Sequence, residues 1–176
     1  MKITLEFTEE EVKSFEEVRS LLGKSNNINY IDLGLPSKTL WADKNIGAEK
    51  SEDYGKYYSF DDAQKYDCPT KEQFKELVEY CNWKWVTYNN TNGYLVIGKN
   101  GNSIFLPAGA RGASYSGVGS YGIYWSNTLD SSTCGHLLNF DNDDIYLENI
   151  CNRYGGFSVR TCKEVEEEDI VDLFWD

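Results

Sequence analysis

The stretch "HLLNFDNDDIYLENICNRYGGFSVR", residues 136–160, decides most of what the sequence says about the fold. Apolar residues alternate with polar ones on both sides of Asn142-Asp143, which is typical of two strands joined by a turn. The apolar positions are Leu138, Phe140, Ile145 and Leu147. The pattern predicts an antiparallel hairpin over residues 135–149 with one buried face and one exposed face.

The side chains between these apolar positions are chemically mixed. The expected exposed face carries His136, Asn139, Asp141, Asp144, Tyr146 and Glu148. A catalytic site would need a few convergent groups, and a purely structural hairpin would carry plain solubilising residues. This face fits neither description.

The composition limits the class of protein. A chain of 176 residues is long enough for one domain and short for two. The net charge of −12 argues against nucleic acid as a partner, because phosphate binding depends on Lys and Arg. No apolar run approaches the roughly 20 residues that a bilayer requires, so we expect a soluble domain without membrane insertion.

The two ends differ from the body, and we divide the chain into residues 1–25, 26–162 and 163–176. The first part becomes acidic where a signal peptide needs an apolar core, so we expect a protein made in the cytoplasm without a signal peptide. After a short strand pattern, Thr8 and Glu11 form a capping-box signature. A helix with an apolar stripe follows, made of Val12, Phe15, Val18, Leu21 and Leu22.

This helix either packs on its own domain or docks to a partner protein. The acidic end, "CKEVEEEDIVDLFWD", leaves a similar choice, since its apolar residues either fold back on the body or insert into a partner groove.

The body shows short apolar segments separated by Gly, Asn, Ser and Asp. "CPTKEQFKELVEYC" predicts a helix with Pro69 near its start and Phe74, Leu77 and Val78 on one face. Asn100-Gly101 predicts a hairpin turn between the two strands of "GYLVIGKNGNSIFLPA". A Gly-rich stretch, "GARGASYSGVGSYG", then leads into a strand at "IYWSNT".

Several of these segments together resemble a known family. They are "YIDLGLPSKTLWADKNIGA", "EDYGKYY", "CPTKEQFKEL", "NGYLVIGKNGNSIFLPAGA", "VGSYGIYWSNT" and "NRYGGFSVR". In this order they resemble the C-type-lectin-fold domains of the Fibrobacter succinogenes major paralogous domain type, found in Bacteroidetes and their phages and kin to the formylglycine-generating enzyme fold. The resemblance covers about residues 29–161. It implies an α+β fold with a small twisted antiparallel sheet, flanking helices and long loops, in which Trp125 and a closing strand at residues 156–160 are framework.

Some relatives are the variable proteins of diversity-generating retroelements, in which exposed hairpin positions are rewritten while the scaffold is kept. The resemblance places these positions at Asp130, Thr133, Cys134, His136, Leu137, Asn139, Asp141, Asn142, Asp144, Tyr146, Glu148, Ile150, Cys151 and Gly155. Tyr115, Tyr121 and Tyr124 in the neighbouring segment would extend the patch. Such side chains suit protein recognition, as in antibody loops.

The resemblance therefore implies a non-enzymatic, receptor-like or adhesin-like binding module of a phage or prophage. Its ligand would be a cell-surface protein or glycan, and residues 1–25 or 163–176 would attach it to a virion or scaffold protein. Two alternatives stay open. One is a structural, assembly or decoration protein of a virion, and the other is a paralogous domain whose exposed face has drifted.

Other chemistries are less well supported. A thiol enzyme of the formylglycine-generating kind needs a close pair of reactive cysteines, and Cys151 stands alone. The five cysteines (Cys68, Cys81, Cys134, Cys151 and Cys162) contain no CxxC pair, so we expect reduced, mostly buried thiols. His136 is the single histidine, which disfavours a Ser/His/Asp hydrolase. Residues 141–144 offer oxygen ligands for calcium, but they fit a solvated acidic turn better. We expect no cofactor and no metal.

Overall fold

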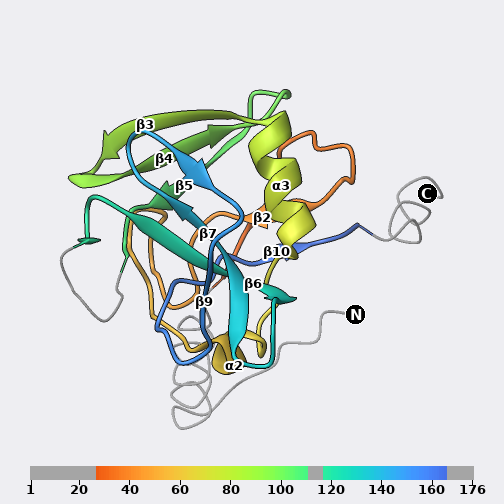
Figure 1. Ribbon diagram of the computed structural model, residues 1–176. Helices are drawn as coiled ribbons and strands as arrows, with labels where there is room; N and C mark the ends of the chain where they lie inside the picture. The colour runs from red at the N-terminus through yellow and green to blue at the C-terminus, as the bar shows by residue number, and fades with distance from the viewer. Residues whose placement is uncertain (1–26, 111–116, 166–176) are drawn as a thin grey trace, which may run out of the picture.

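The computed structural model of the chain describes residues 27–110 and 117–165 (Figure 1). Its architecture is mixed but strand-rich, with three small antiparallel sheets and, within the described residues, two α-helices. The expected small antiparallel sheets and helices are present, which is consistent with an α+β or a mostly-β class. The expected strand and helix of residues 1–25 and most of the tail lie outside the described residues.

The first sheet holds both ends of the described chain. It is formed by β1 (Tyr30–Asp32), β2 (Leu40–Ala42) and β10 (Cys162–Lys163), with β2 in the middle. β1 and β10 each pair with β2 in the antiparallel sense. The described chain therefore starts and ends on the same small sheet.

The second sheet consists of β3 (Asn82–Tyr88), β4 (Thr91–Ile97) and β5 (Ser103–Pro107). The predicted turn at Asn100-Gly101 between β4 and β5 is confirmed, and Gly101 has the positive φ (87°) that such a turn requires. Asn89 and Asn90 join β3 to β4, also with positive φ (45° and 64°). Two such residues in a two-residue loop are the signature of a type I′ hairpin, a signal that our sequence analysis did not use.

The helices lie on opposite sides of the third sheet. The predicted helix is α3 (Lys71–Tyr80), in which Phe74 and Leu77 are buried, and Thr70 and Gln73 form a capping box at its start. The short α2 (Phe60–Ala63) was not predicted from the sequence. In Figure 1, α3 stands beside the second sheet and α2 lies below β6 and β9.

The third sheet contains the hairpin predicted over residues 135–149. It is formed by β6 (Gly122–Leu129), β7 (Cys134–Phe140), β8 (Ile145–Tyr146) and β9 (Ile150–Asn152). β7 is central, because it pairs with β6 on one side and with β8 and then β9 on the other. The outer edge of the sheet is thus formed by residues 145–152.

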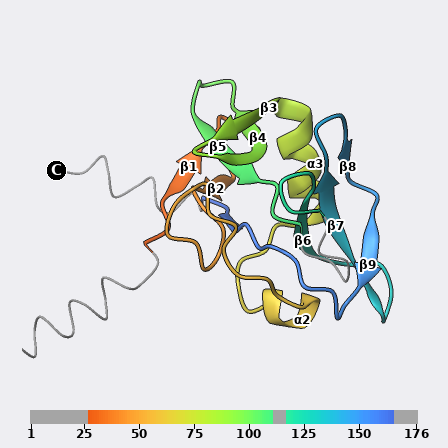
Figure 2. The same cartoon turned by 90° about the vertical axis from the view of Figure 1, so that its left-hand side faces the viewer.

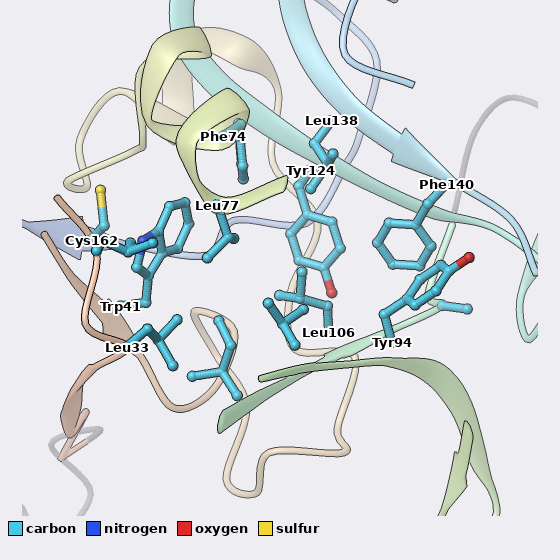
Figure 3. Packing of buried hydrophobic residues seen from close by; sticks show 14 residues of the cluster. Leu33, Trp41, Phe74, Leu77, Tyr94, Leu106, Tyr124, Leu138, Phe140 and Cys162 are labelled. Atoms are coloured by element: carbon cyan, nitrogen blue, oxygen red, sulfur yellow. The ribbon is translucent and has the colours of Figure 1, made fainter. Parts of the chain in front are cut away.

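A large aromatic core packs against one face of this sheet. Tyr124, Leu138 and Phe140 are completely buried there, and the ring of Phe140 lies 5.2 Å from that of Tyr94 in β4 (Figure 3). Trp41 and Phe74 pack at the other end of the same cluster, with ring centroids 5.5 Å apart. This cluster joins all three sheets to α3.

A second core covers part of the opposite face. Trp125 lies between Phe60 and Phe157, with ring centroids 5.4 and 4.9 Å away, and Leu137 belongs to the same cluster. The indole N–H of Trp125 donates to the Tyr58 carbonyl oxygen at 2.8 Å. Burying large apolar side chains of this kind contributes roughly 1.5–3 kcal/mol each. The third sheet is therefore a middle layer between two cores.

The segment before β10 is a buried framework element. Phe157 and Val159 are buried, and Arg160 is completely buried with its guanidinium donating to the side-chain oxygen of Asn45 and to the carbonyl oxygens of Ala42 and Phe105, at 2.8–3.0 Å. The segment forms isolated bridges to Tyr58 and Tyr124 where the resemblance implied a regular strand.

Candidate binding surface

The apolar frame of the predicted hairpin is confirmed. Leu138 and Phe140 are fully buried, and Ile145 and Leu147 pack against the same core. The turn is longer than Asn142-Asp143, because β7 ends at Phe140 and β8 starts at Ile145. Residues 141–144 form the loop, closed by a bond from the Asp141 N–H to the Asp144 carbonyl oxygen.

The expectation that the hairpin has one fully exposed face is wrong. Leu137 is only 5% exposed because the second core covers it, so its assignment as a surface residue is corrected. Tyr124 is completely buried against Phe140, so it cannot extend a surface patch. Tyr115, which was expected to extend it too, lies outside the described residues.

His136 and Asn139 lie on opposite faces of β7, although both were expected on the exposed face. Cross-strand partners share a face, and His136 pairs with Ile150 whereas Asn139 pairs with Tyr146. The His136 side chain is 14% exposed and its Nε2 lies 3.6 Å from an Asp130 carboxylate oxygen. Asn139 is half-buried, with a side-chain oxygen that has no hydrogen-bond partner among the described residues.

Seven of the remaining predicted positions form two groups, mostly exposed, at opposite ends of the third sheet. One end contains Asp130 and Thr133 in the β6–β7 loop, next to β9. The other contains the acidic loop of residues 141–144, Tyr146, and Tyr121 just before β6. Seven residues of β7 separate the two ends by about 20 Å.

The outer edge of the sheet connects these two ends. Between the Asn139–Tyr146 pair and the His136–Ile150 pair, β7 has two residues and the outer strand has three, so the edge contains a β-bulge at residues 147–149. Glu148 lies in this bulge, exposed, and Ile150 is 46% exposed directly after it. We call residues 129–133 and 141–154 together the edge surface.

Two apolar residues of the edge surface were not predicted from the sequence. Tyr154 is 89% exposed, the largest value among the exposed large hydrophobic residues of the described chain, and Leu129 is 51% exposed. Tyr154 precedes Gly155-Gly156, a turn signal that could have indicated its position. Cys134, Cys151 and Gly155, which the resemblance also implied, are all half-buried.

The edge surface is acidic. Lys71 contacts Glu148 at 2.7 Å and this bond lowers the pKa of Glu148, while the guanidinium of Arg153 pairs with Asp61. No lysine or arginine of the described residues pairs with the other carboxylates of the surface, which belong to Asp130, Asp141, Asp143 and Asp144. A partner with a positive surface would be attracted to it.

Hydrogen bonds between the Asp141 side chain and the loop backbone hold the conformation of the acidic loop. A side-chain oxygen of Asp141 accepts hydrogen bonds from the N–H groups of Asp143 and Asp144, both at 2.9 Å. These two bonds lower the pKa of Asp141 from its usual value. Within residues 27–110 and 117–165, no three His, Cys, Asp or Glu side chains are grouped so as to hold a metal ion.

Burial raises the pKa values of several cysteine thiols. Cys68 and Cys162 are buried, and burial raises the pKa of each thiol to about 12. Burial likewise raises the pKa of Cys151, the thiol within the edge surface that a thiol enzyme would use. A raised pKa lowers the thiolate fraction and so disfavours nucleophilic chemistry.

Comparisons with known proteins found no relative of this chain. No family model matches the chain, and neither a curated protein nor a solved structure matches it. In the part of the chain that the structure describes, no helix has the length and apolar character needed to span a membrane. The observations define a mixed, strand-rich domain with an exposed, chemically mixed and acidic sheet edge.

Proposed function

We propose that the chain is a non-enzymatic binding module that recognises a protein on a cell surface through the edge surface. This proposal depends on one observation: the buried side chains that hold the fold together and the exposed residues of the edge surface are largely different sets. The framework side chains lie in two cores. Within the edge surface, Ile145, Leu147 and Cys151 pack against these cores, whereas the exposed, chemically mixed residues contribute little to either core. Their identities can change without a large cost in stability, which is what a recognition surface requires.

We further propose that the domain has the C-type-lectin fold that the sequence resembles. The buried positions of Trp125 and Arg160 support this assignment, since the resemblance makes both of them framework. The short sheets joined by long loops are also in keeping with it. On this basis we propose a variable protein of a phage or prophage retroelement, with exposed edge positions as its diversified residues.

The size and shape of the edge surface favour a protein over a small ligand. A hollow at this surface, lined by Asp61, Ser132, Thr133, Arg153 and Tyr154, has a volume of about 230 Å³. Small-molecule sites usually enclose about 300–1,000 Å³. The two ends lie about 20 Å apart, a distance that one protein interface of roughly 800 Å² per partner can cover.

The orientation of the domain also suits recognition. β1 and β2, next to both ends of the described chain, lie on one side of the molecule, and β8 and β9 lie on the opposite side (Figure 2). A chain attached to a particle through either end would therefore present the edge surface outward.

Population sequencing tests the proposal of diversification. The gene is sequenced from an actively propagated population of its host or phage, and substitutions are scored codon by codon over residues 117–165. We expect changes at the exposed positions Asp130, Thr133, Asn142, Asp144, Tyr146 and Ile150, with Leu137, Leu138 and Trp125 fixed. Changes distributed evenly over buried and exposed codons would contradict the proposal.

Cell binding tests recognition itself. Fluorescently labelled full-length chain is incubated with cells of the bacterium in which the gene or its phage propagates, and bound protein is measured by flow cytometry. Tyr146→Ala and Tyr154→Ala should each weaken binding, whereas Tyr66→Ala, at an exposed tyrosine outside the edge surface, should not. Binding should also weaken with added salt, because the surface is acidic.

A structural or assembly protein of a virion is the alternative function. Incorporation into particles that survives Tyr146→Ala and Tyr154→Ala, together with no cell binding by the unmodified chain, would favour the alternative.

A further inference from the structure

A second surface feature lies away from the edge surface. It is an open groove of about 580 Å³ between the first sheet and one face of the second sheet. Its apolar lining consists of Ile31, Val86, Tyr88, Leu95, Ile104 and Phe105. Asp43 and Ser51 contribute to its polar part.

The strand register explains why this groove is apolar. Leu95 pairs with Phe105 and with Lys84, so the side chains of Val86, Leu95 and Phe105 share one face of the sheet. The neighbouring residues Tyr94 and Val96 point to the other face, into the aromatic core. The second sheet thus has apolar residues on both faces. On the face that lines the groove, Val86 and Leu95 are only half-buried and Tyr88 is 47% exposed.

The direction of the strands shows which end of the chain lies at the groove. Asn29 donates from its backbone N–H to an Asp43 carboxylate oxygen at 3.2 Å, and the Asp43 N–H donates to the Asn29 carbonyl oxygen at 2.8 Å. Asp43 lines the groove, so the chain enters the described domain at the groove's rim. At the other end, Lys163 pairs with Leu40, and Glu164 contacts Gln73 in α3. Because β10 is antiparallel to β2, the chain leaves the domain away from Asp43.

The sequence before Asn27 has the length and pattern to fill such a groove. Residues 8–22, at 1.5 Å per residue, would form a helix about 22 Å long, and the seven residues of β3 or β4 span a similar length of about 20 Å. Val12, Phe15, Val18 and Leu22 recur at helical spacing within one stripe. The residues between Leu22 and Asn29 can extend to about 23 Å, which is enough to place this stripe over the groove.

We propose that the groove is the docking site for the amphipathic segment at residues 8–22 of the same chain. The apolar stripe of the segment covers Val86, Tyr88 and Leu95, and its glutamates face solvent or reach Lys84, which has no ion-pair partner within the described residues. This assigns the N-terminal segment to its own domain and leaves the C-terminal segment as the end available for attachment. The proposal is independent of what the edge surface binds.

Nuclear magnetic resonance of the full-length chain with labelled valine and leucine methyl groups tests this docking. We expect nuclear Overhauser contacts between the Phe15 ring and the methyl groups of Val86 and Leu95. A sample mixed from labelled and unlabelled chains distinguishes contacts within one chain from contacts between two copies. Amide hydrogen exchange should be at least about tenfold slower over residues 12–22 than in the isolated peptide.

Two pairs of variants sharpen the test. Phe15→Asp on the segment and Tyr88→Asp in the groove should each abolish the contacts and the tenfold protection. The matched controls are Lys13→Asp, on the polar side of the stripe, and Tyr154→Asp, at an exposed tyrosine outside the groove, and both should retain them.

Three results would overturn the proposal. They are contacts seen only between two chains, exchange of residues 12–22 at the rate of the free peptide, and protection that survives Tyr88→Asp. The first would assign the groove to a second copy of the chain. None of these results would alter the expected cell binding of the edge surface.

Discussion

Leu137 provides the most direct test of how the third sheet is layered. It stands among residues that the family resemblance treats as variable, yet it is 5% exposed within the core that contains Trp125 and Phe157. Ile150, on the outer edge, is 46% exposed. Truncating each residue to alanine removes the same number of carbon atoms, so the pair isolates the effect of burial.

The expected magnitudes follow from these exposures. Leu137→Ala removes three carbon groups at about 0.8 kcal/mol each, and the cavity left in a packed core raises the total to about 3–4 kcal/mol. Ile150→Ala removes half-exposed groups and leaves no enclosed cavity, so we expect about 1 kcal/mol. The two free energies of unfolding should therefore differ by about 2–3 kcal/mol.

Urea unfolding followed by tryptophan fluorescence measures both values, with Trp125 next to the Leu137 site as one reporter. The variant with the larger loss should also unfold at a temperature lower by about 2–4 °C per kcal/mol. Equal costs for the two variants, or a cost below about 1 kcal/mol for Leu137→Ala, would refute the two-core arrangement and return Leu137 to the candidate binding positions.

Three further predictions concern the framework, the acidic loop and a buried thiol. A Cβ atom at Gly135 would lie 2.4 Å from the Phe60 ring, so Gly135→Ala should lower the free energy of unfolding by about 1–3 kcal/mol in urea titration. A Cβ atom at Gly156 would lie 3.8 Å from its nearest neighbour, the Cβ of Tyr57, so Gly156→Ala should lower the free energy of unfolding less. The pKa of Asp141 is lowered in the folded chain, so its carboxylate stabilises the loop above the usual carboxyl pKa, and this contribution is lost as the pH falls through the lower folded-state value. A pH titration by nuclear magnetic resonance should show the Asp141 carboxyl midpoint below 3.8, and a midpoint at or above that value would contradict the loop geometry. Because burial raises the pKa of Cys68 to about 12, iodoacetamide at pH 8.5 should modify it far more slowly in the native chain than in urea, and equal rates in the two conditions would show that the thiol is not buried.

Local sequence patterns predicted the elements whose stability depends on near neighbours. The helix now seen as α3 followed from the spacing of Phe74 and Leu77, and the turn at Gly101 followed from its Asn-Gly pair. The apolar frame of the hairpin followed from the alternation of Leu138 and Phe140. In each case the relevant partners lie within a few residues along the chain, so the sequence contains the whole signal.

The candidate surface could be predicted only in part, because a strand's alternation does not say what packs on each face. Leu137 is buried because Phe157 and Trp125 meet on its face, which no pattern within the hairpin indicates. Alternation alone would place Tyr146 and Ile150 on the same face. The bulge at residues 147–149 inserts one residue and moves Ile150 to the face of His136.

The sequence by itself therefore determined the strands, the main helix and the excess of negative charge, since these depend on composition and on short-range periodicity. Only the tertiary structure decided that the third sheet is a middle layer with two buried faces, and that its exposed residues are confined to the outer edge and the two ends. The physical reason is that burial depends on contacts between segments distant in the chain, such as Phe60, Trp125 and Phe157 around one indole ring.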